Sequence, residues 1–299
     1  MNLFFDDESI PCFRPPSEAD SFILRVTRGC AHNKCTYCNM YRGVQFAMLK
    51  DEEISKQIAL ASAYKKQVRR IFLADGDALV LQTEKLLKIL NILFDTFPYL
   101  ERVSTYAAPK DMLRKSVEEL KALNDAGLKL FYYGMETGDD ATLKAINKGV
   151  NAEETIEAGR RTVEAGITLS VMIILGIAGM ENSERNALAT AKALNIIKPN
   201  MLSALCLMLY RGSELKEQFE RGEFHPLPPA GLMHELGILM ENLELPKGYG
   251  TLFRSNHYSN YVNFKGTLPD DKERLLKEIK LAEAELKKMK NYDVYNFYK

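Results

Sequence analysis

The chain has 299 residues, of which 46% are hydrophobic and 27% charged, a globular composition with enough length for one large domain or two smaller ones. Forty basic residues balance forty acidic ones, which argues against a dedicated nucleic-acid-binding protein, since such a protein needs an excess of basic side chains. The first residues, MNLFFDD, lack the basic start and apolar run of a secretory signal, and every apolar run is shorter than the roughly 18 residues of a membrane span. We therefore expect a soluble cytoplasmic protein that does not bind membranes.

From residue 21 on, short β-branched or aromatic runs alternate with longer amphipathic runs, the pattern of strands followed by helices. The predicted strands cover residues 21–27, 69–75, 101–107, 128–136, 167–175 and 201–209. The predicted helices cover residues 50–68, 82–97, 111–127, 139–147, 152–166 and 183–197. Strands joined by helical crossovers run parallel, and apolar runs such as VMIIL fit strands buried on both faces. The sequence predicts an α/β fold with a parallel sheet, either open or curled toward a barrel.

A repeated phrase marks two of the joints between helix and strand. DAGLKL, which includes Gly127, recurs as EAGITL, which includes Gly166. A glycine directly after a helix predicts a left-handed cap. The recurrence supports a repeated structural unit.

The composition changes after about residue 210. The phrase HPLPPAG is followed by a predicted helix over 232–243, a loop-like stretch over 246–271 and a charged helix over 271–290. We predict an N-terminal extension over 1–20, a core over 21–210 and a C-terminal extension over 211–299 that packs on the core.

Three of the five cysteines lie in the phrase RGCAHNKCTYCNM, with the spacing C-x4-C-x2-C: Cys30, Cys35 and Cys38. This phrase directly follows the first predicted strand, at the end of the strand where parallel α/β folds bind ligands. An odd number of cysteines without a signal peptide argues against a disulfide framework and favours metal ligands. Cys12 and Cys206 stand apart, and we expect them to be structural thiols.

Three kinds of metal site fit this spacing. Zinc could recruit His32 to complete a Cys3His site, although His32 lies only two residues from Cys30. A plant-type [2Fe-2S] cluster uses the same spacing but requires a fourth cysteine. A [4Fe-4S] cluster with three protein ligands and one open iron accounts for the absence of a fourth clustered thiolate.

The cysteine phrase resembles that of the radical S-adenosylmethionine (SAM) superfamily, whose usual signature is C-x3-C-x2-C with an aromatic residue before the third cysteine. Tyr37 occupies the aromatic position, and one extra residue separates the first two cysteines. The resemblance covers roughly residues 20–210. It implies a partial (β/α)6 barrel, a [4Fe-4S] cluster on the three cysteines, and SAM bound to the open iron.

Three further phrases carry the resemblance. LADGDAL is similar to the turn that contacts the SAM amino group and offers Asp75, Gly76 and Asp77. GMETGDDATLKAINKG is similar to a segment of the coproporphyrinogen-oxidase-like and methylthiotransferase-like branches, and IILGIAGMENSE is similar to the motif that follows the fifth strand.

The resemblance also implies the positions of further SAM-binding residues. It places Tyr37 beside the adenine, Glu136 and Thr137 near the ribose and methionine, and Lys148 or Arg160 beside the SAM carboxylate. The alternatives are that Tyr37 only packs within its loop, that Glu136 caps a helix, and that the side chains of the two basic residues are exposed to solvent.

The predicted loop before the last helix gathers polar and aromatic side chains, which are typical of a lid or a substrate contact. Arg254 and His257 are our first candidates for anchoring an anionic substrate or moving a proton. A loop that packs back on the barrel through its tyrosines is the alternative.

The resemblance implies that the enzyme reductively cleaves SAM to a 5′-deoxyadenosyl radical that abstracts hydrogen from a small-molecule substrate. A reduced flavodoxin or ferredoxin would supply the electron. The alternatives are an RNA- or protein-modifying relative and a non-catalytic iron-sulfur or haem-carrier protein. The chain has neither a basic appendage nor a second cysteine cluster, so nucleic acid is not the expected substrate.

Overall fold

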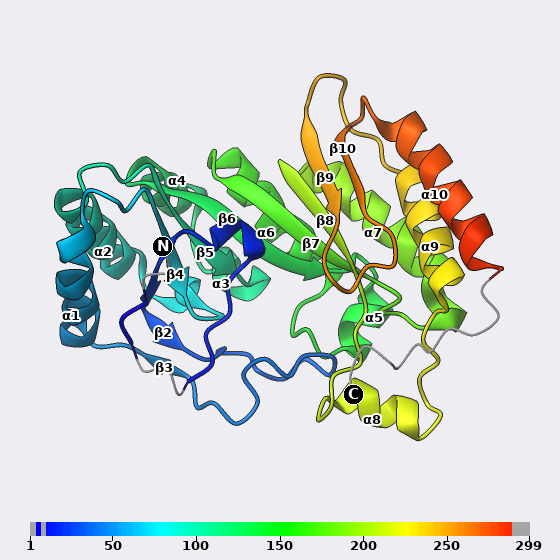
Figure 1. The fold of residues 1–299 in the computed structure, drawn as a ribbon, viewed down its shortest axis with the longest axis horizontal. Helices are drawn as coiled ribbons and strands as arrows, with labels where there is room; N and C mark the ends of the chain where they lie inside the picture. Colours follow the sequence, from blue (N-terminus) through cyan, green and yellow to red (C-terminus); the bar gives the residue numbers. More distant parts are fainter. Residues whose placement is uncertain (1–3, 7–9, 289–299) are drawn as a thin grey trace. The chain divides into compact units, whose positions relative to one another are not determined.

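The computed structural model describes residues 4–6 and 10–288. The chain divides into two compact units, which Figure 1 shows in ribbon form. The first unit contains the described residues up to 33 together with 40–134 and 161–169, and the second contains 34–39, 135–160 and those from 170 on. The predicted boundaries at residues 20 and 210 stay predictions. Among the described helices, none is long and apolar enough to cross a membrane.

The first unit is built on four parallel strands in the order β1-β4-β5-β6. Their bounds are Phe22–Arg25, Arg70–Ala74, Arg102–Ala107 and Leu128–Glu136. Leu24 pairs with Leu73, and Thr105 pairs with Phe131. These strands are buried almost throughout, as expected for parallel strands covered on both faces.

The helices of the first unit follow the strands along the chain. They are α1 (Asp51–Ala61), α2 (Thr83–Thr96), α3 (Pro109–Leu113) and α4 (Val117–Asp125). Helix α1 packs against β1, and α2 packs against α4. A short antiparallel pair, β2 (Thr27–Arg28) and β3 (Ala47–Met48), frames the loop that carries the cysteines.

The second unit contains most of β7 (Thr168–Leu175), from Ser170 on. It also contains β8 (Met201–Cys206), β9 (Thr251–Ser255) and β10 (Phe264–Leu268). β8 is parallel to β7 and to β9, and β10 is antiparallel to β9. Short α5 (Asp140–Ala145) and α8 (Glu214–Glu220) belong to this unit, and α6 (Ala152–Glu164) joins the two units along the chain.

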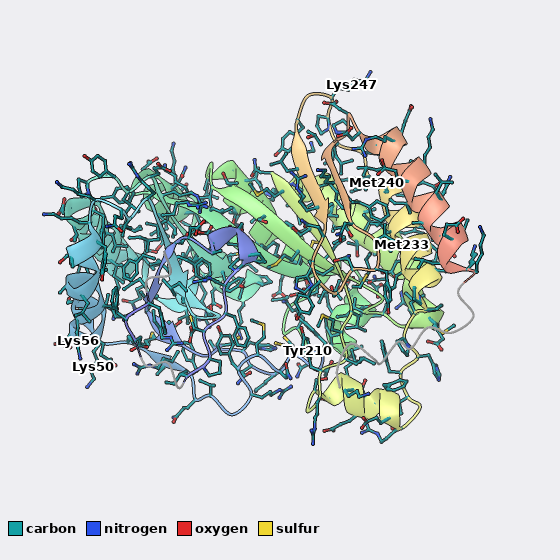
Figure 2. The ribbon with its side chains drawn as sticks, in the orientation of Figure 1. Lys50, Lys56, Tyr210, Met233, Met240 and Lys247 are labelled. Carbon is teal, nitrogen blue, oxygen red and sulfur yellow. The ribbon has the colours of Figure 1, made fainter. Side chains whose placement is uncertain are left out.

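The helical layer of the second unit consists of α7 (Ser183–Ile197), α9 (Pro229–Glu241) and α10 (Lys272–Leu286). Helix α9 packs against both of the others, as Figure 1 shows. Met233 and Met240, labelled in Figure 2, are fully buried on α9. The C-terminal helices therefore belong to the core of this unit.

The predicted α/β class with parallel strands is confirmed, and β6 and α7 have the predicted bounds. The predicted helix over 111–127 is wrong, because Ser116 accepts a hydrogen bond from the Glu119 N–H and caps the separate helix α4. The prediction of a loop over 246–271 is also wrong, since β9 and β10 form a hairpin there. In β9 buried and exposed residues alternate, and the polar residues of the exposed face concealed the strand pattern.

Gly127 confirms the predicted left-handed position after a helix, with a φ of 104°. A Cβ atom at Gly127 would lie 2.1 Å from Cε2 of Phe94. Replacing Gly127 with alanine should lower the free energy of unfolding by roughly 2 kcal/mol or more, because strain and overpacking add. Urea unfolding of the two proteins measures this difference.

Gly237 is the matched control, because it lies inside α9 and an added Cβ would make only an ordinary contact, 3.7 Å from Ile279. Gly237→Ala should raise the free energy of unfolding by up to about 1 kcal/mol. Equal effects at the two positions would contradict the steric argument.

Candidate functional site

The first site cysteine follows β1 in a loop that is tied to the loop after β4. The Gly29 N–H donates to Oδ2 of Asp75 at 3.0 Å, and the Gly76 N–H donates to the Gly29 carbonyl at 3.2 Å. These two bonds hold the backbone beside Cys30, whose side chain is half-buried.

Asp75 is fully buried and pairs with the equally buried Arg25, whose Nε lies 3.2 Å from Oδ1. Burial raises the pKa of Asp75, while Arg25 and the Gly29 N–H oppose the shift. Arg25 also donates to Asp6 at 2.9 Å, so it fixes the N-terminal segment as well. Asp75 therefore fixes the loop by accepting hydrogen bonds from the donors that surround it.

Gly76 leaves no room for a side chain. A Cβ atom at Gly76 would lie 2.7 Å from Cε2 of Tyr41 and 3.4 Å from Cβ of Cys30. The backbone after β4 thus lies directly against the first cysteine.

Asp77 is 1% exposed, and its Oδ1 has no hydrogen-bond partner among the described residues. The pKa of Asp77 is raised to about 8, first by burial and then by the Asp111 carboxyl, while Arg114 and the Ala31 N–H oppose the shift. A buried oxygen without a donor is costly, and it marks Asp77 as an acceptor available to a ligand.

The other two cysteines belong to the second unit, in the segment 34–39. Its backbone is held at both ends of Thr36: the Thr36 N–H donates to the Ile146 carbonyl, and the Thr36 carbonyl accepts from the Leu215 N–H, both at 2.9 Å. The Cys38 N–H donates to the Cys35 carbonyl at 3.3 Å, which closes a tight turn between the two thiols.

Tyr37, Glu136 and Lys148 lie together beside this turn. Lys148 Nζ lies 2.7 Å from Oε1 of Glu136, and both side chains are nearly buried. Burial raises the pKa of Tyr37 well above its usual value, and Glu136, Cys35 and Cys38 raise it further. Glu136 has a φ of 65°, a strained conformation for a non-glycine residue that must be held by its surroundings.

Thr137 is completely buried and faces α7. Its hydroxyl donates to Oδ1 of Asn186 at 2.5 Å and accepts from the Asp139 N–H at 2.9 Å. Helix capping in this phrase comes from Asp139, which accepts from the Thr142 N–H at 2.9 Å. The structure therefore gives Thr137 a packing partner, and its predicted contact with SAM stays a prediction.

Arg160 lies on α6 and forms two hydrogen bonds with Glu157, at 2.8 and 3.0 Å. Its side chain is 48% exposed. Its predicted contact with the SAM carboxylate stays a prediction.

Arg254 lies on β9, in a strand where a loop was expected. It is exposed, and its Nη1 donates to the Phe253 carbonyl at 2.7 Å. His257 follows the same strand, and its Nδ1 accepts from the Ser259 N–H at 3.3 Å. Burial lowers the pKa of His257, so near pH 7 the imidazole is neutral with its proton on Nε2.

Sequence reasoning missed two buried charged residues that shape these loops, Arg25 and Glu235. Arg25 interrupts the apolar strand FILRVT, and Glu235 interrupts the apolar helix phrase LMHELGILM. A single charge inside an otherwise apolar segment is the signal that could have identified both, because buried charges require partners.

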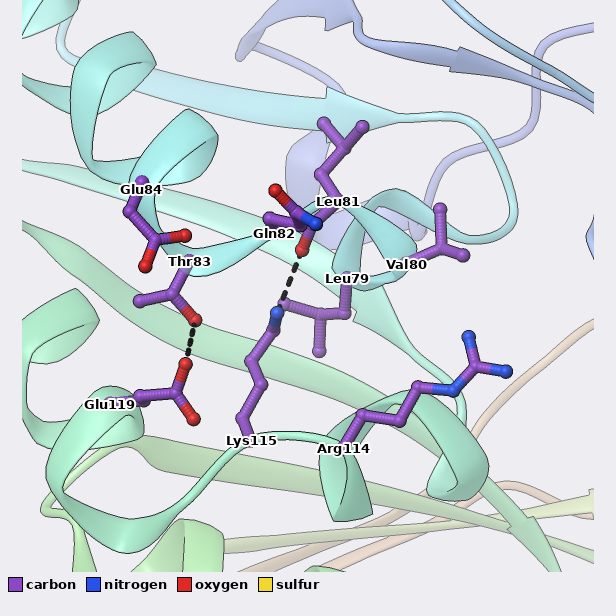
Figure 3. A pocket seen from close by; sticks show the side chains of 9 residues that line it. All are labelled: Leu79, Val80, Leu81, Gln82, Thr83, Glu84, Arg114, Lys115 and Glu119. Carbon is purple, nitrogen blue, oxygen red and sulfur yellow. Dashed lines mark hydrogen bonds between the residues drawn. The ribbon is translucent and has the colours of Figure 1, made fainter.

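A cavity of about 450 Å³ opens in the first unit between the start of α2 and the residues after α3 (Figure 3). Lys115 donates to the Leu81 carbonyl at 2.7 Å, and Thr83 donates to Glu119 at 2.7 Å. None of the predicted site residues lines this cavity. The residues that line it are Leu79, Val80, Leu81, Gln82, Thr83, Glu84, Arg114, Lys115 and Glu119.

In the part of the chain that the structure describes, no three histidine, cysteine or acidic side chains are gathered to hold a single metal ion. The thiolates of a [4Fe-4S] cluster bind different iron atoms, so they need not converge on one point. Three soft thiolates on one short loop fit the donor set of such a cluster. Asp77 with its unpartnered buried oxygen fits a cationic ligand beside it.

The family model described as the radical SAM superfamily matches residues 24–191, more than half of the chain. The chain belongs to the radical SAM superfamily. The resemblance seen in the sequence motifs is thereby confirmed.

This radical SAM protein is similar to the uncharacterized protein MJ0486 of Methanocaldococcus jannaschii, with 25% identity over 67% of this chain and 64% of that protein. The fold is shared with coproporphyrinogen III oxidase (HemN) from Escherichia coli, with a TM-score of 0.54, 14% identity, and coverage of 74% of this chain and 52% of that one. Methylornithine synthase (PylB) gives a TM-score of 0.52, 13% identity and coverage of 92% and 83%. These likenesses establish the partial barrel fold.

The raised pKa of Asp77 makes the stability of the protein depend on pH. The folded protein keeps this proton up to about pH 8, whereas the unfolded chain releases it near the ordinary value of 3.8. Because the folded protein binds this proton more tightly than the unfolded chain does, the proton stabilises the fold. This contribution is fully present below pH 3.8 and is lost as the pH rises through about 8. Asp77→Asn removes this loss, so the variant should gain stability relative to wild type as the pH rises from about 5 to about 8, with no further gain above that, measured by urea unfolding.

Asp51→Asn is the control, because Lys88 and Lys85 lower the pKa of the exposed Asp51 carboxyl. Asp51 is ionised over this whole range, so its variant should differ from wild type by a constant amount. A pH-independent difference for Asp77→Asn as well would refute the assignment of a protonated Asp77.

Proposed function

We propose that this protein is a radical SAM enzyme that holds a [4Fe-4S] cluster on Cys30, Cys35 and Cys38, reductively cleaves SAM, and uses the 5′-deoxyadenosyl radical to abstract hydrogen from a small-molecule substrate. The observation that carries the proposal is the C-x4-C-x2-C phrase in the loop between β2 and β3 of a chain of this superfamily. The short stretch of chain from Cys30 to Cys38 keeps the three thiols within reach of one cluster.

A bound cluster would supply the one electron that reductive cleavage of SAM to methionine and the 5′-deoxyadenosyl radical requires. The residues of the chain supply binding, orientation and exclusion of water. Cys30, Cys35 and Cys38 would hold the cluster with three thiolates, which would leave one position of a [4Fe-4S] cluster for SAM.

Asp77 is proposed to accept a hydrogen bond from the SAM amino group through its unpartnered Oδ1. Approach of this cation favours the ionised carboxylate and opposes the burial that raises the Asp77 pKa. Asp75 and Gly76 act with it by fixing the backbone against Cys30.

The remaining groups of SAM are assigned to other residues. Lys148 is proposed to pair with the SAM carboxylate as well as with Glu136, since an ammonium can donate to more than one acceptor. Glu136 and Thr137 are assigned to the ribose and methionine end, Tyr37 to the adenine, and Arg160 is a further candidate for the carboxylate.

The substrate is proposed to be a small molecule, with a flavodoxin or ferredoxin as the electron donor. Arg254 carries a permanent charge on an exposed strand and is suited to an anionic substrate group. His257, neutral near pH 7, is suited to donate a hydrogen bond from Nε2.

Replacing any one of Cys30, Cys35 and Cys38 with alanine should abolish cluster assembly and SAM cleavage, because each thiolate is proposed to hold a different iron. Anaerobic reconstitution of wild type should give about four iron atoms per chain, and dithionite with SAM should give 5′-deoxyadenosine. Iron analysis, electron paramagnetic resonance and chromatography of the nucleoside measure these outcomes.

Cys206→Ala is the matched control, since this buried thiol, whose pKa burial raises to about 12, is not a proposed ligand. It should retain both the iron and the cleavage of SAM. An intact cluster that yields no 5′-deoxyadenosine would refute the enzyme proposal and favour a non-catalytic iron-sulfur protein.

A further inference from the structure

Glu235 is a buried carboxylate of α9, 1% exposed, with three neutral donors around it. Oε1 accepts from the Gly176 N–H at 3.2 Å and from the Asn186 side-chain amide at 3.0 Å. Oε2 accepts from the Ser183 hydroxyl at 2.6 Å. Burial raises the pKa of Glu235, and these three hydrogen bonds oppose the shift.

This carboxylate fixes the direction of the hydrogen bonds that follow it. Oε1 of Glu235 accepts from the Asn186 side-chain amide, so the Asn186 NH2 group faces Glu235. The Asn186 oxygen then faces the Thr137 hydroxyl, which donates to it at 2.5 Å. Because the Thr137 hydroxyl proton is used in this hydrogen bond, the Thr137 oxygen accepts from the Asp139 N–H.

Thr190 closes the same network from α7. Its hydroxyl lies 3.3 Å from the Thr137 hydroxyl and accepts from the Gly138 N–H at 3.0 Å. The backbone at Gly138 and Asp139 is therefore held by two hydroxyl groups, both of which are buried.

The anchored backbone comes directly after Glu136. Glu136 keeps a φ of 65° only if the residues after it are fixed. This conformation places its carboxylate 2.7 Å from Lys148 Nζ and beside the Tyr37 phenol. The hydrogen-bond network that begins at Glu235 on α9 thus extends to the residues that we assign to SAM binding.

We propose that Glu235 is a positioning residue for the SAM site, acting through Asn186 and Thr137 to hold Glu136 in the conformation that binds the cofactor. This inference rests on the proposed function. It assigns to α9, which the family match does not reach, a part in cofactor binding.

Three variants of the full chain test the role. Glu235→Met keeps the size of the side chain but removes the acceptor. The hydrogen-bond relay from Glu235 through Asn186 to Thr137 then loses its fixed direction. Asn186→Leu interrupts the relay at its next member without touching Glu235. Glu235→Gln keeps an oxygen for Gly176 and Asn186, and its NH2 group can donate to the Ser183 oxygen, so it should restore the wild-type behaviour.

The first measurement needs no cofactor. Hydrogen exchange of a peptide that covers residues 135–142 should be faster in Glu235→Met and Asn186→Leu than in wild type, because the Thr137 and Thr190 hydroxyls that accept from the Asp139 and Gly138 amides lose their fixed orientation. Glu235→Gln should exchange at the wild-type rate.

The second measurement is the affinity of the reconstituted proteins for SAM, with the cluster's electron paramagnetic resonance signal as the readout. Loss of outer-sphere partners typically weakens cofactor-site affinity by about 10-fold or more, and Glu235→Met and Asn186→Leu should show a change of this size. Glu235→Gln should stay within about twofold of wild type. Glu241→Gln is the matched control on α9, since Glu241 is exposed and pairs with Lys280 at 2.9 Å.

The outcomes separate the two proposals. If wild type with an intact cluster does not bind SAM, the proposed function fails, and the exchange of residues 135–142 alone then decides whether Glu235 positions this segment. If Glu235→Met and Asn186→Leu only lower stability, with exchange and SAM affinity as in wild type, the positioning role is overturned. If Glu235→Met does not fold, Asn186→Leu decides between the same two results.

Discussion

Two loops at the carboxyl ends of strands are each held by a buried carboxylate that accepts a backbone N–H. Asp75 accepts from Gly29 in the first unit, and Glu235 accepts from Gly176 in the second. A loop that folds close over the end of a buried strand cannot expose all its N–H groups to water, so it requires such acceptors. The backbone beside Cys30 depends on the first of these bonds, and Glu235 also reaches the segment after Glu136 through Asn186 and Thr137.

The protein neutralises its buried carboxylates in different ways. Asp75 has the buried guanidinium of Arg25 as its counter-ion, and Glu235 is surrounded by neutral donors. Asp77 keeps its proton to about pH 8 beside the carboxyl of Asp111. A fully paired carboxylate stabilises a fixed backbone, whereas one with an unpartnered oxygen remains able to respond to an arriving cation.

Most elements could be predicted from the sequence because their periodicity is local. β6 and α7 have the predicted bounds, and the left-handed glycine at Gly127 follows from the residues beside it. The failures depend on context. β9 and β10 are stabilised by pairing with each other and with β8, and no residue within either short segment shows that a partner strand is present.

The sequence by itself determined the α/β class, the superfamily and the three cysteines, because strand alternation and ligand spacing are properties of neighbouring residues. Only the tertiary structure decided that Arg25 and Glu235 are buried, that Lys148 pairs with Glu136, and that Arg254 lies on a strand. These facts join residues that are distant in the chain, and their pKa values and hydrogen-bond directions exist only once folding has removed water from around them.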